Sequence, residues 1–191
     1  MYTERIGRAA RETREVKIYV EINLDGKSYR VRTPYRFFTH ILETMAHHGG
    51  IGLSVEAEGD MSHHVIEDTG IALGEALAIA LGDRRGIKRF GYALIPMDDA
   101  LVAVAIDLAR RPYSSISLGL RGSYIEDIDG SLIEHFLRSM SSSGYFTMHA
   151  VKLAGEDPHH IAEACFKALG VSLSQASSRS SGEIISVKGV A

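Results

Sequence analysis

The sequence has one cysteine, no long apolar run and no surplus of positive charge. Cys165 alone cannot form an internal disulfide framework or a thiolate metal cluster, which fits a reducing compartment. No apolar stretch approaches the roughly 18 residues that a membrane helix needs. Residues 1–11 carry charges with no apolar stretch after them, so they lack the pattern of a secretory signal. We therefore expect a cytoplasmic protein without a membrane partner.

Lysine and arginine total 21 against 24 for aspartate and glutamate, a formal net charge of −3. Without a basic surplus, a dominant nucleic-acid-binding surface is not expected. The 191 residues, 45% of them hydrophobic, suffice for one compact unit or two small halves that share a core. Histidine is the exception to this ordinary composition, because there are 9 and most of them are clustered.

Hydrophobic periodicity divides the chain into two similar halves. The first half is predicted to contain a β-hairpin of strands 16–22 and 28–33, a helix at 37–48, a strand at 51–57 and a helix at 64–81. The second half repeats this order with strands at 101–108 and 113–118, a helix at 131–142, a strand at 145–153 and a helix at 158–173. A strand at 88–95 fits either sheet, the serine-rich stretch 172–181 is expected to be a loop, and 184–189 is expected to be ordered.

The repeat extends to polar residues at the start of the last helix in each half. His63-His64-Val65-Ile66-Glu67 opens one helix and His159-His160-Ile161-Ala162-Glu163 opens the other. For a chain of this composition roughly 0.03 matches to HHxxE are expected by chance, so two are a strong signal. We interpret the pattern as an internal duplication, with half-domain repeats at 1–98 and 99–191 that form one unit.

These motifs have the spacing of metal ligands. Residues three or four apart share a helix face, so each glutamate can lie beside the histidines of its motif. Adjacent histidines are turned about 100° apart, so each motif offers ligands to two different metals. His40 and His149 are further available donors, and a donor set without sulfur suits Mn, Fe, Co, Ni or Zn. His47 and His135 lie outside the motifs and are interpreted as ordinary surface or hydrogen-bonded histidines.

Candidate anion-binding residues stand beside glycine or proline. Arg89 precedes Phe90-Gly91, Arg111 precedes Pro112, and Ser186 and Lys188 share the segment Ser186-Val187-Lys188-Gly189. Arginine offers a planar fork to phosphate, while lysine and serine add a charge and a hydroxyl donor. Taken alone, each is more often a solvated surface cation, and Glu15 by itself has the pattern of an ordinary exposed carboxylate.

Several motifs together resemble the imidazoleglycerol-phosphate dehydratases, the lyases of histidine biosynthesis, from about Arg11 to Gly189. The motifs are Arg11-Glu12-Thr13-Arg14-Glu15, Leu24-Asp25-Gly26, Gly59-Asp60 before the first histidine pair, Gly86-Ile87-Lys88-Arg89-Phe90-Gly91, Pro96-Met97-Asp98-Asp99-Ala100-Leu101, Arg111-Pro112, the second histidine pair with Glu163-Ala164-Cys165-Phe166-Lys167-Ala168, and Ser186-Val187-Lys188-Gly189. Their order along the chain makes the resemblance specific.

The resemblance implies an α+β fold of internally duplicated half-domains, each a four-stranded sheet with two helices on one face, as in domain 2 of ribosomal protein S5. It implies a large cage-like homo-oligomer of about 24 subunits, with active sites between subunits. Two Mn²⁺ ions per active site would be held by His40, His63, His64, Glu67, His149, His159, His160 and Glu163. A small phosphorylated imidazole would be bound by His48, Arg89, Arg111, Ser186 and Lys188, with Glu15 as the acid/base carboxylate.

The implied reaction dehydrates D-erythro-imidazole glycerol phosphate to imidazole acetol phosphate. Metals on the imidazole nitrogens favour a dimanganese-bound imidazolate, whose electrons can expel the hydroxyl and leave a diazafulvene-like intermediate. Glu15 would move a proton in one of these steps. Two alternatives use the same ligands: a dinuclear metallohydrolase of a phosphorylated small molecule, and a metal-assembled shell without catalysis.

Four positions depart from the pattern of the family. Thr39 replaces an aspartate before His40, and Ser62 replaces an aspartate before the first histidine pair. Arg110 replaces a glycine before Arg111, and Val187 replaces a threonine in the closing motif. All eight expected metal ligands are present, so metal binding is expected to be better preserved than catalytic efficiency.

Overall fold

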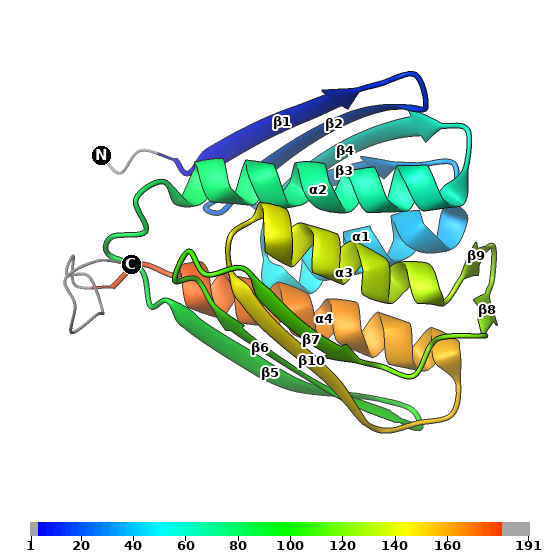
Figure 1. Ribbon diagram of the computed structural model, residues 1–191. Coiled ribbons are helices and arrows are strands. Elements are labelled where there is room, and N and C mark those ends of the chain that lie inside the picture. Colours follow the sequence, from blue (N-terminus) through cyan, green and yellow to red (C-terminus); the bar gives the residue numbers. More distant parts are fainter. Residues whose placement is uncertain (1–3, 181–191) are drawn as a thin grey trace.

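Two four-stranded sheets enclose a middle layer of helices in the computed structural model, which describes residues 4–180 (Figure 1). The first half comprises β1 (Ile6–Glu12), β2 (Val16–Asn23), β3 (Tyr29–Arg32), α1 (Arg36–Gly49), β4 (Gly52–Gly59) and α2 (Ser62–Leu81). The second comprises β5 (Phe90–Met97), β6 (Ala100–Asp107), β7 (Tyr113–Ser117), the short β8 (Tyr124–Ile125) and β9 (Ile128–Asp129), α3 (Ser131–Ser143), β10 (Thr147–Ala154) and α4 (Pro158–Ser177).

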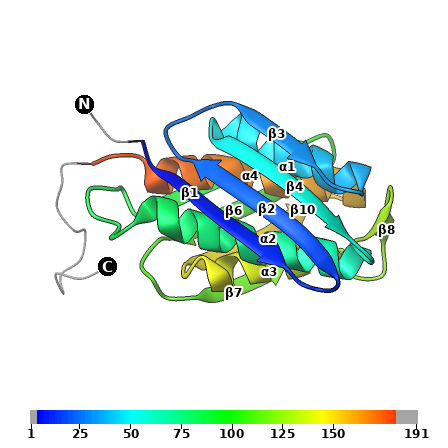
Figure 2. The same ribbon diagram turned by 90° about the horizontal axis from the view of Figure 1, so that it is seen from above.

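The two sheets have the same topology. Their strand orders are β1-β2-β4-β3 and β5-β6-β10-β7, and in each sheet only the last pair is parallel. Burial alternates along β2, as expected for a strand with one covered face. Val16, Ile18, Val20 and Ile22 face the helices, while the residues between them face outward. Figure 2 shows the helices beneath one face of the first sheet. The duplicated α+β architecture is therefore confirmed.

The predicted hairpin of 16–22 and 28–33 is wrong, because β4 lies between β2 and β3. β3 pairs with β4 in parallel, and a parallel pair needs a crossover, which α1 supplies. The hairpin partner of β2 is instead β1, which the sequence analysis missed. The run Gly-Arg-Ala-Ala-Arg in β1 has few large apolar side chains and so little periodicity.

Two further boundaries differ from the expectation. β5 pairs with β6, so the sheets divide the chain between α2 and β5, earlier than residue 98. α4 continues through the serine-rich stretch to Ser177, because Ser172 is buried and its hydroxyl donates to the Val104 carbonyl oxygen at 3.1 Å. The segment 184–189 lies outside the described residues. Within the described part, none of the helices combines the length and apolar character needed to cross a membrane.

Glycines let the central helices pack with their backbones close together. A Cβ atom on Gly74 in α2 would lie 2.5 Å from the carbonyl oxygen of Met140 in α3. A Cβ atom on Gly170 in α4 would likewise overlap the carbonyl oxygen of Met45 in α1. The same close approach thus occurs at equivalent places in both helix pairs, α2–α3 and α1–α4.

We predict that Gly74→Ala and Gly170→Ala each lower the free energy of unfolding by about 1–3 kcal/mol, because the added methyl group must displace a helix backbone. Chemical denaturation of the metal-free protein measures the change. Ile79→Ala, on the exposed side of α2, is the control and should change stability by about 0.5 kcal/mol or less. Equal stability of the glycine variants and this control would contradict the packing argument.

Candidate metal centre

Both HHxxE motifs begin a helix. Asp157 caps α4 by accepting the backbone N–H of His159 at 2.8 Å, and Pro158 occupies the first turn. α2 begins after Met61, which supplies no side-chain cap. The two motifs therefore present their histidines at the N-terminal ends of the two longest helices, both on the same side of the molecule in Figure 1.

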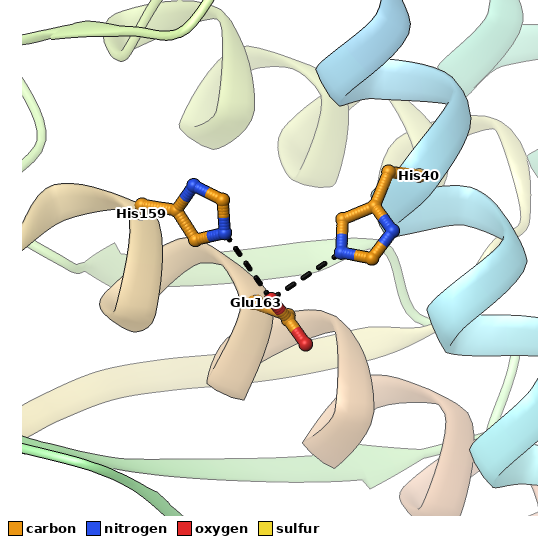
Figure 3. Close-up of side chains that lie close together, drawn as sticks. All are labelled: His40, His159 and Glu163. Carbon is orange, nitrogen blue, oxygen red and sulfur yellow. Dashed lines mark ion pairs between the residues drawn. The ribbon is translucent and has the colours of Figure 1, made fainter.

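The first donor group joins α1 to α4. Nε2 of His40 and Nε2 of His159 both lie 3.3 Å from Oε2 of Glu163, and the two imidazoles point at the same carboxylate (Figure 3). Lys167 Nζ lies 2.9 Å from the other carboxylate oxygen. Burial acts to raise the pKa of Glu163, but the hydrogen bonds from Lys167 and His40 outweigh it and keep this pKa below its usual value.

The second donor group joins α2 to α3. Oε2 of Glu67 lies 3.1 Å from Nε2 of His63 and 3.2 Å from Nε2 of His135. The two imidazoles stack with their centroids 5.0 Å apart. His135 is the fifth residue of α3, as His40 is the fifth of α1, so the two groups are equivalent under the duplication.

His135 completes the second donor group, whereas His149, a ligand that the resemblance implies, lies outside both groups of this chain. His149 lies on the outer face of the second sheet, where its ring is 5.7 Å from that of Tyr113, and the structure does not bring it to either donor group. The repeat itself contained the missed signal. His40 and His135 are 95 residues apart, and the first histidines of the two motifs are 96 apart.

The second histidine of each motif points away from its neighbour. The rings of His63 and His64 are inclined by 79°, and those of His159 and His160 by 80°, so the expected divergence is seen. Nδ1 of His64 lies 2.8 Å from Asp60, and this hydrogen bond raises the pKa of His64.

Asp99 makes the corresponding contact to His160 in the second half. Nδ1 of His160 lies 2.7 Å from Asp99, and this hydrogen bond raises the pKa of His160. Nδ1 of each of these two histidines is thus beside a carboxylate, neither histidine belongs to a donor group, and Nε2 of His160 lies 3.4 Å from Asp98.

Glu15 lies next to the first motif, at the turn between β1 and β2. Its Oε2 is 3.7 Å from Nδ1 of His64, and its side chain is 58% exposed. A carboxylate that the sequence pattern did not single out by itself is thus placed beside a candidate metal ligand, within reach of a bound molecule.

The two donor groups fit a divalent transition metal. In each group the three ligating atoms, two imidazole nitrogens and one carboxylate oxygen, lie within 4.8 Å of one another. Nε2 of His135 is buried and has no hydrogen-bond partner among the described residues, although it faces Glu67. A buried nitrogen without a partner is costly, and a bound cation would remove that cost. Beside this group lies a cavity of about 520 Å³ that Arg121 and Arg138 also line.

Arg89 and Arg111 meet at the end of β6. The guanidinium of Arg89 contacts both carboxylate oxygens of Asp107, at 2.7 and 3.0 Å, and Arg111 lies 3.7 Å from the same carboxylate. Their partners in the expected phosphate site, Ser186 and Lys188, lie outside the described residues. His48 lies near the C-terminal end of α1, where partial desolvation lowers its pKa.

The arginine pair is far from the donor groups of the same chain. The backbone N–H of Arg89 donates to the carbonyl oxygen of Ala176, near the C-terminal end of α4. His159 is at the other end of that helix, about 25 Å away at 1.5 Å per residue. Among the described residues of one chain, the two donor groups and the arginine pair therefore lie at opposite ends.

The fold and the site together define the class of this protein. It is a duplicated α+β protein with two candidate metal sites, each a His–His–Glu group that takes ligands from both halves. A sequence model of the imidazoleglycerol-phosphate dehydratases matches residues 33–173. The chain belongs to the imidazoleglycerol-phosphate dehydratase family, the dehydratases of histidine biosynthesis.

Relatives and solved structures agree over nearly the whole chain. The Caldicellulosiruptor saccharolyticus enzyme is 40% identical over 97% of this chain and 98% of its own, and a Clostridium botulinum enzyme is 44% identical over 92% of both. The structure of the Pyrococcus furiosus enzyme has a TM-score of 0.84 at 37% identity, covering 95% of this chain and 99% of that one. The Staphylococcus aureus enzyme has a TM-score of 0.84 at 32% identity, covering 92% and 99%.

We predict that His135→Ala removes one of two bound metals per chain, because it removes one of the three donors of the second group. His47→Ala should leave the metal content unchanged, because His47 is exposed, lies outside both groups and is not an expected ligand. Elemental analysis of the purified variants after loading with Mn²⁺ measures both. Full metal content in His135→Ala would contradict the assignment.

Proposed function

We propose that this chain dehydrates D-erythro-imidazole glycerol phosphate to imidazole acetol phosphate with two Mn²⁺ ions per active site. The observation that carries the proposal is the equivalent pair of donor groups, His40–His159–Glu163 and His63–Glu67–His135. Both groups have nitrogen and oxygen donors without sulfur, which suits Mn²⁺ among other divalent ions.

Each donor group would hold one metal ion through three ligands. His64 and His160 face away from these groups, and we propose that they supply ligands to metals bound by neighbouring copies. When bound, the ions supply positive charge that lowers the pKa of the substrate imidazole. The carboxylates of Asp60 and Asp99 on the Nδ1 atoms of these two histidines would leave Nε2 as the ligating atom.

Residues of the chain bind the rest of the substrate and move its protons. The exposed carboxylate of Glu15, beside His64, is placed to exchange a proton with the glycerol arm of an imidazole held there. Arg89, Arg111, Ser186 and Lys188, with His48, would bind the phosphate. Asp107 orients the two arginine side chains, and the clamp contributes by positioning the substrate.

The separation of the arginine pair from the donor groups supports a homo-oligomer. Because His159 and Arg89 are about 25 Å apart in one chain, they would contact one small substrate only if they came from different copies. The outer face of the second sheet also exposes several large apolar side chains that an assembly would cover: Phe90, Tyr92, Leu94, Val151 and Leu153. We propose a cage of about 24 subunits in the cytoplasm, where the free thiol of Cys165 stays reduced.

We predict that the Mn²⁺-loaded protein converts imidazole glycerol phosphate to the dehydrated ketone, and that Glu15→Gln lowers kcat at least about 100-fold by removing the proton acceptor. Metal content and particle size of the variant should be unchanged. Product analysis by mass spectrometry measures the turnover. Release of inorganic phosphate instead would identify a metallohydrolase, and an assembled protein without turnover would be a non-catalytic shell. Full activity of Glu15→Gln would refute the role of Glu15.

We also predict that a chelator dissociates the oligomer as it stops turnover, because His64 and His160 would lose the ions that join copies. Light scattering before and after complete metal removal measures the particle mass, and adding back Mn²⁺ should restore it. A particle of unchanged mass with no metal left would exclude metal sites shared between copies.

A further inference from the structure

The β8–β9 hairpin is where the duplication breaks. In the first half β3 leads almost directly into α1, whereas in the second half residues 118–130, including this hairpin, lie between β7 and α3. The hairpin turns at Glu126, whose φ of 52° is in the left-handed region. That conformation costs energy for any residue other than glycine, so a side chain kept there points to a function for it.

The carboxylate of Glu126 reaches the first donor group. Its Oε1 lies 3.1 Å from Nδ1 of His159, while Nε2 of the same imidazole faces Glu163 at 3.3 Å. A carboxylate that accepts the Nδ1–H of an imidazole fixes the tautomer in which Nε2 carries the free lone pair. The ring of Phe37 packs against the imidazole of His159, with centroids 4.9 Å apart, and restricts rotation of the imidazole.

The next residue of the hairpin holds the helix that carries His40. Asp127 accepts the backbone N–H groups of Arg36 and Phe37 at 2.6 and 3.1 Å. Tyr35, which precedes α1, supplies no side-chain cap, so Asp127 provides the cap from the other half of the chain. Consecutive residues of one turn therefore position both imidazoles of the first donor group.

The local alternatives offer no such carboxylate. Thr39, beside His40, hydrogen-bonds through its hydroxyl to Thr33 at 3.0 Å. In the second donor group, no carboxylate of the described residues pairs with Nδ1 of His63, whose ring stacks on His135 instead. Orientation by a carboxylate is thus a property of the first group.

We propose that Glu126 is a positioning residue for the metal held by His40, His159 and Glu163, acting through Nδ1 of His159. This inference rests on the proposed metal function. It makes the two equivalent sites unequal, because one of them depends on a carboxylate that the other lacks. Glu126 contacts Nδ1 of His159 and not Nε2, the proposed ligating atom, so it acts through the geometry of His159.

Titration of the metal-free protein with Mn²⁺ in competition with a chelator tests the proposal. Glu126→Ala should weaken binding at one of two sites by about 10–100-fold and leave the other unchanged. Glu126→Gln should lose less, because its amide oxygen can still accept the Nδ1–H. Glu75→Ala, an exposed carboxylate in the middle of α2, is the control and should bind both ions as the parent protein does.

Glu126→Gly separates positioning from stability. Glycine adopts a φ of 52° without strain, so the denaturation midpoint of the metal-free variant should equal or exceed that of the parent protein. Its affinity for Mn²⁺ at the first site should nevertheless fall as in Glu126→Ala. A purely structural role would instead lower the midpoint and weaken both sites together, which would overturn the proposal.

Two outcomes distinguish this inference from the proposed function. If the parent protein binds two Mn²⁺ ions and Glu126→Ala binds them equally well, the positioning role is wrong and the metal function stands. If the parent protein binds no Mn²⁺ at all, the proposed metal function fails and the role of Glu126 fails with it.

Discussion

The packing of each half's first helix against the other half's last helix is the contact on which the candidate site depends. His40 in α1 meets Glu163 in α4, and His135 in α3 meets Glu67 in α2, so neither donor group is contained in one half. The helices approach closely because Gly74 and Gly170 have no side chain to separate the backbones. A half-domain alone could not assemble a donor group, because each group takes ligands from both halves.

Each donor group concentrates polar atoms at a helix end, where burial is incomplete. In each group two imidazoles face one carboxylate at 3.1–3.3 Å, and these contacts satisfy only part of their hydrogen-bonding capacity. The Nε2 atom of His135, which has no hydrogen-bond partner among the described residues, shows this. Mutual contact keeps the donors together, and a bound cation would satisfy the remaining nitrogen. Carboxylates also lie beside Nδ1 of His64, His159 and His160, so the site is organised one layer beyond its candidate ligands.

Much of this could be predicted from sequence, and the failures have physical causes. The HHxxE motifs are local helical patterns, so the helices, the divergence of paired histidines and the duplication were all visible. The position of β3 was not, because strand order depends on a crossover that local periodicity does not encode. His135 was interpreted as an ordinary histidine because it lies outside the HHxxE motifs, whereas its equivalence to His40 under the repeat identifies it as a donor. The contact between Glu126 and His159 spans 33 residues and arises only in the folded chain.

The separation of the two ends of each chain links catalysis to assembly. Arg89 and Arg111 lie by the C-terminal ends of the helices whose N-terminal ends carry the histidines, and a rigid α4 fixes that separation. An imidazole with a three-carbon phosphate arm is far shorter than a helix of this length. Under the proposed function, a substrate held by the donor groups of one copy would meet Arg89 and Arg111 of another copy. Under the proposed function, the outward-facing His64 and His160 meet the same requirement from the metal side, so the contacts that build the cage are also those that complete each active site.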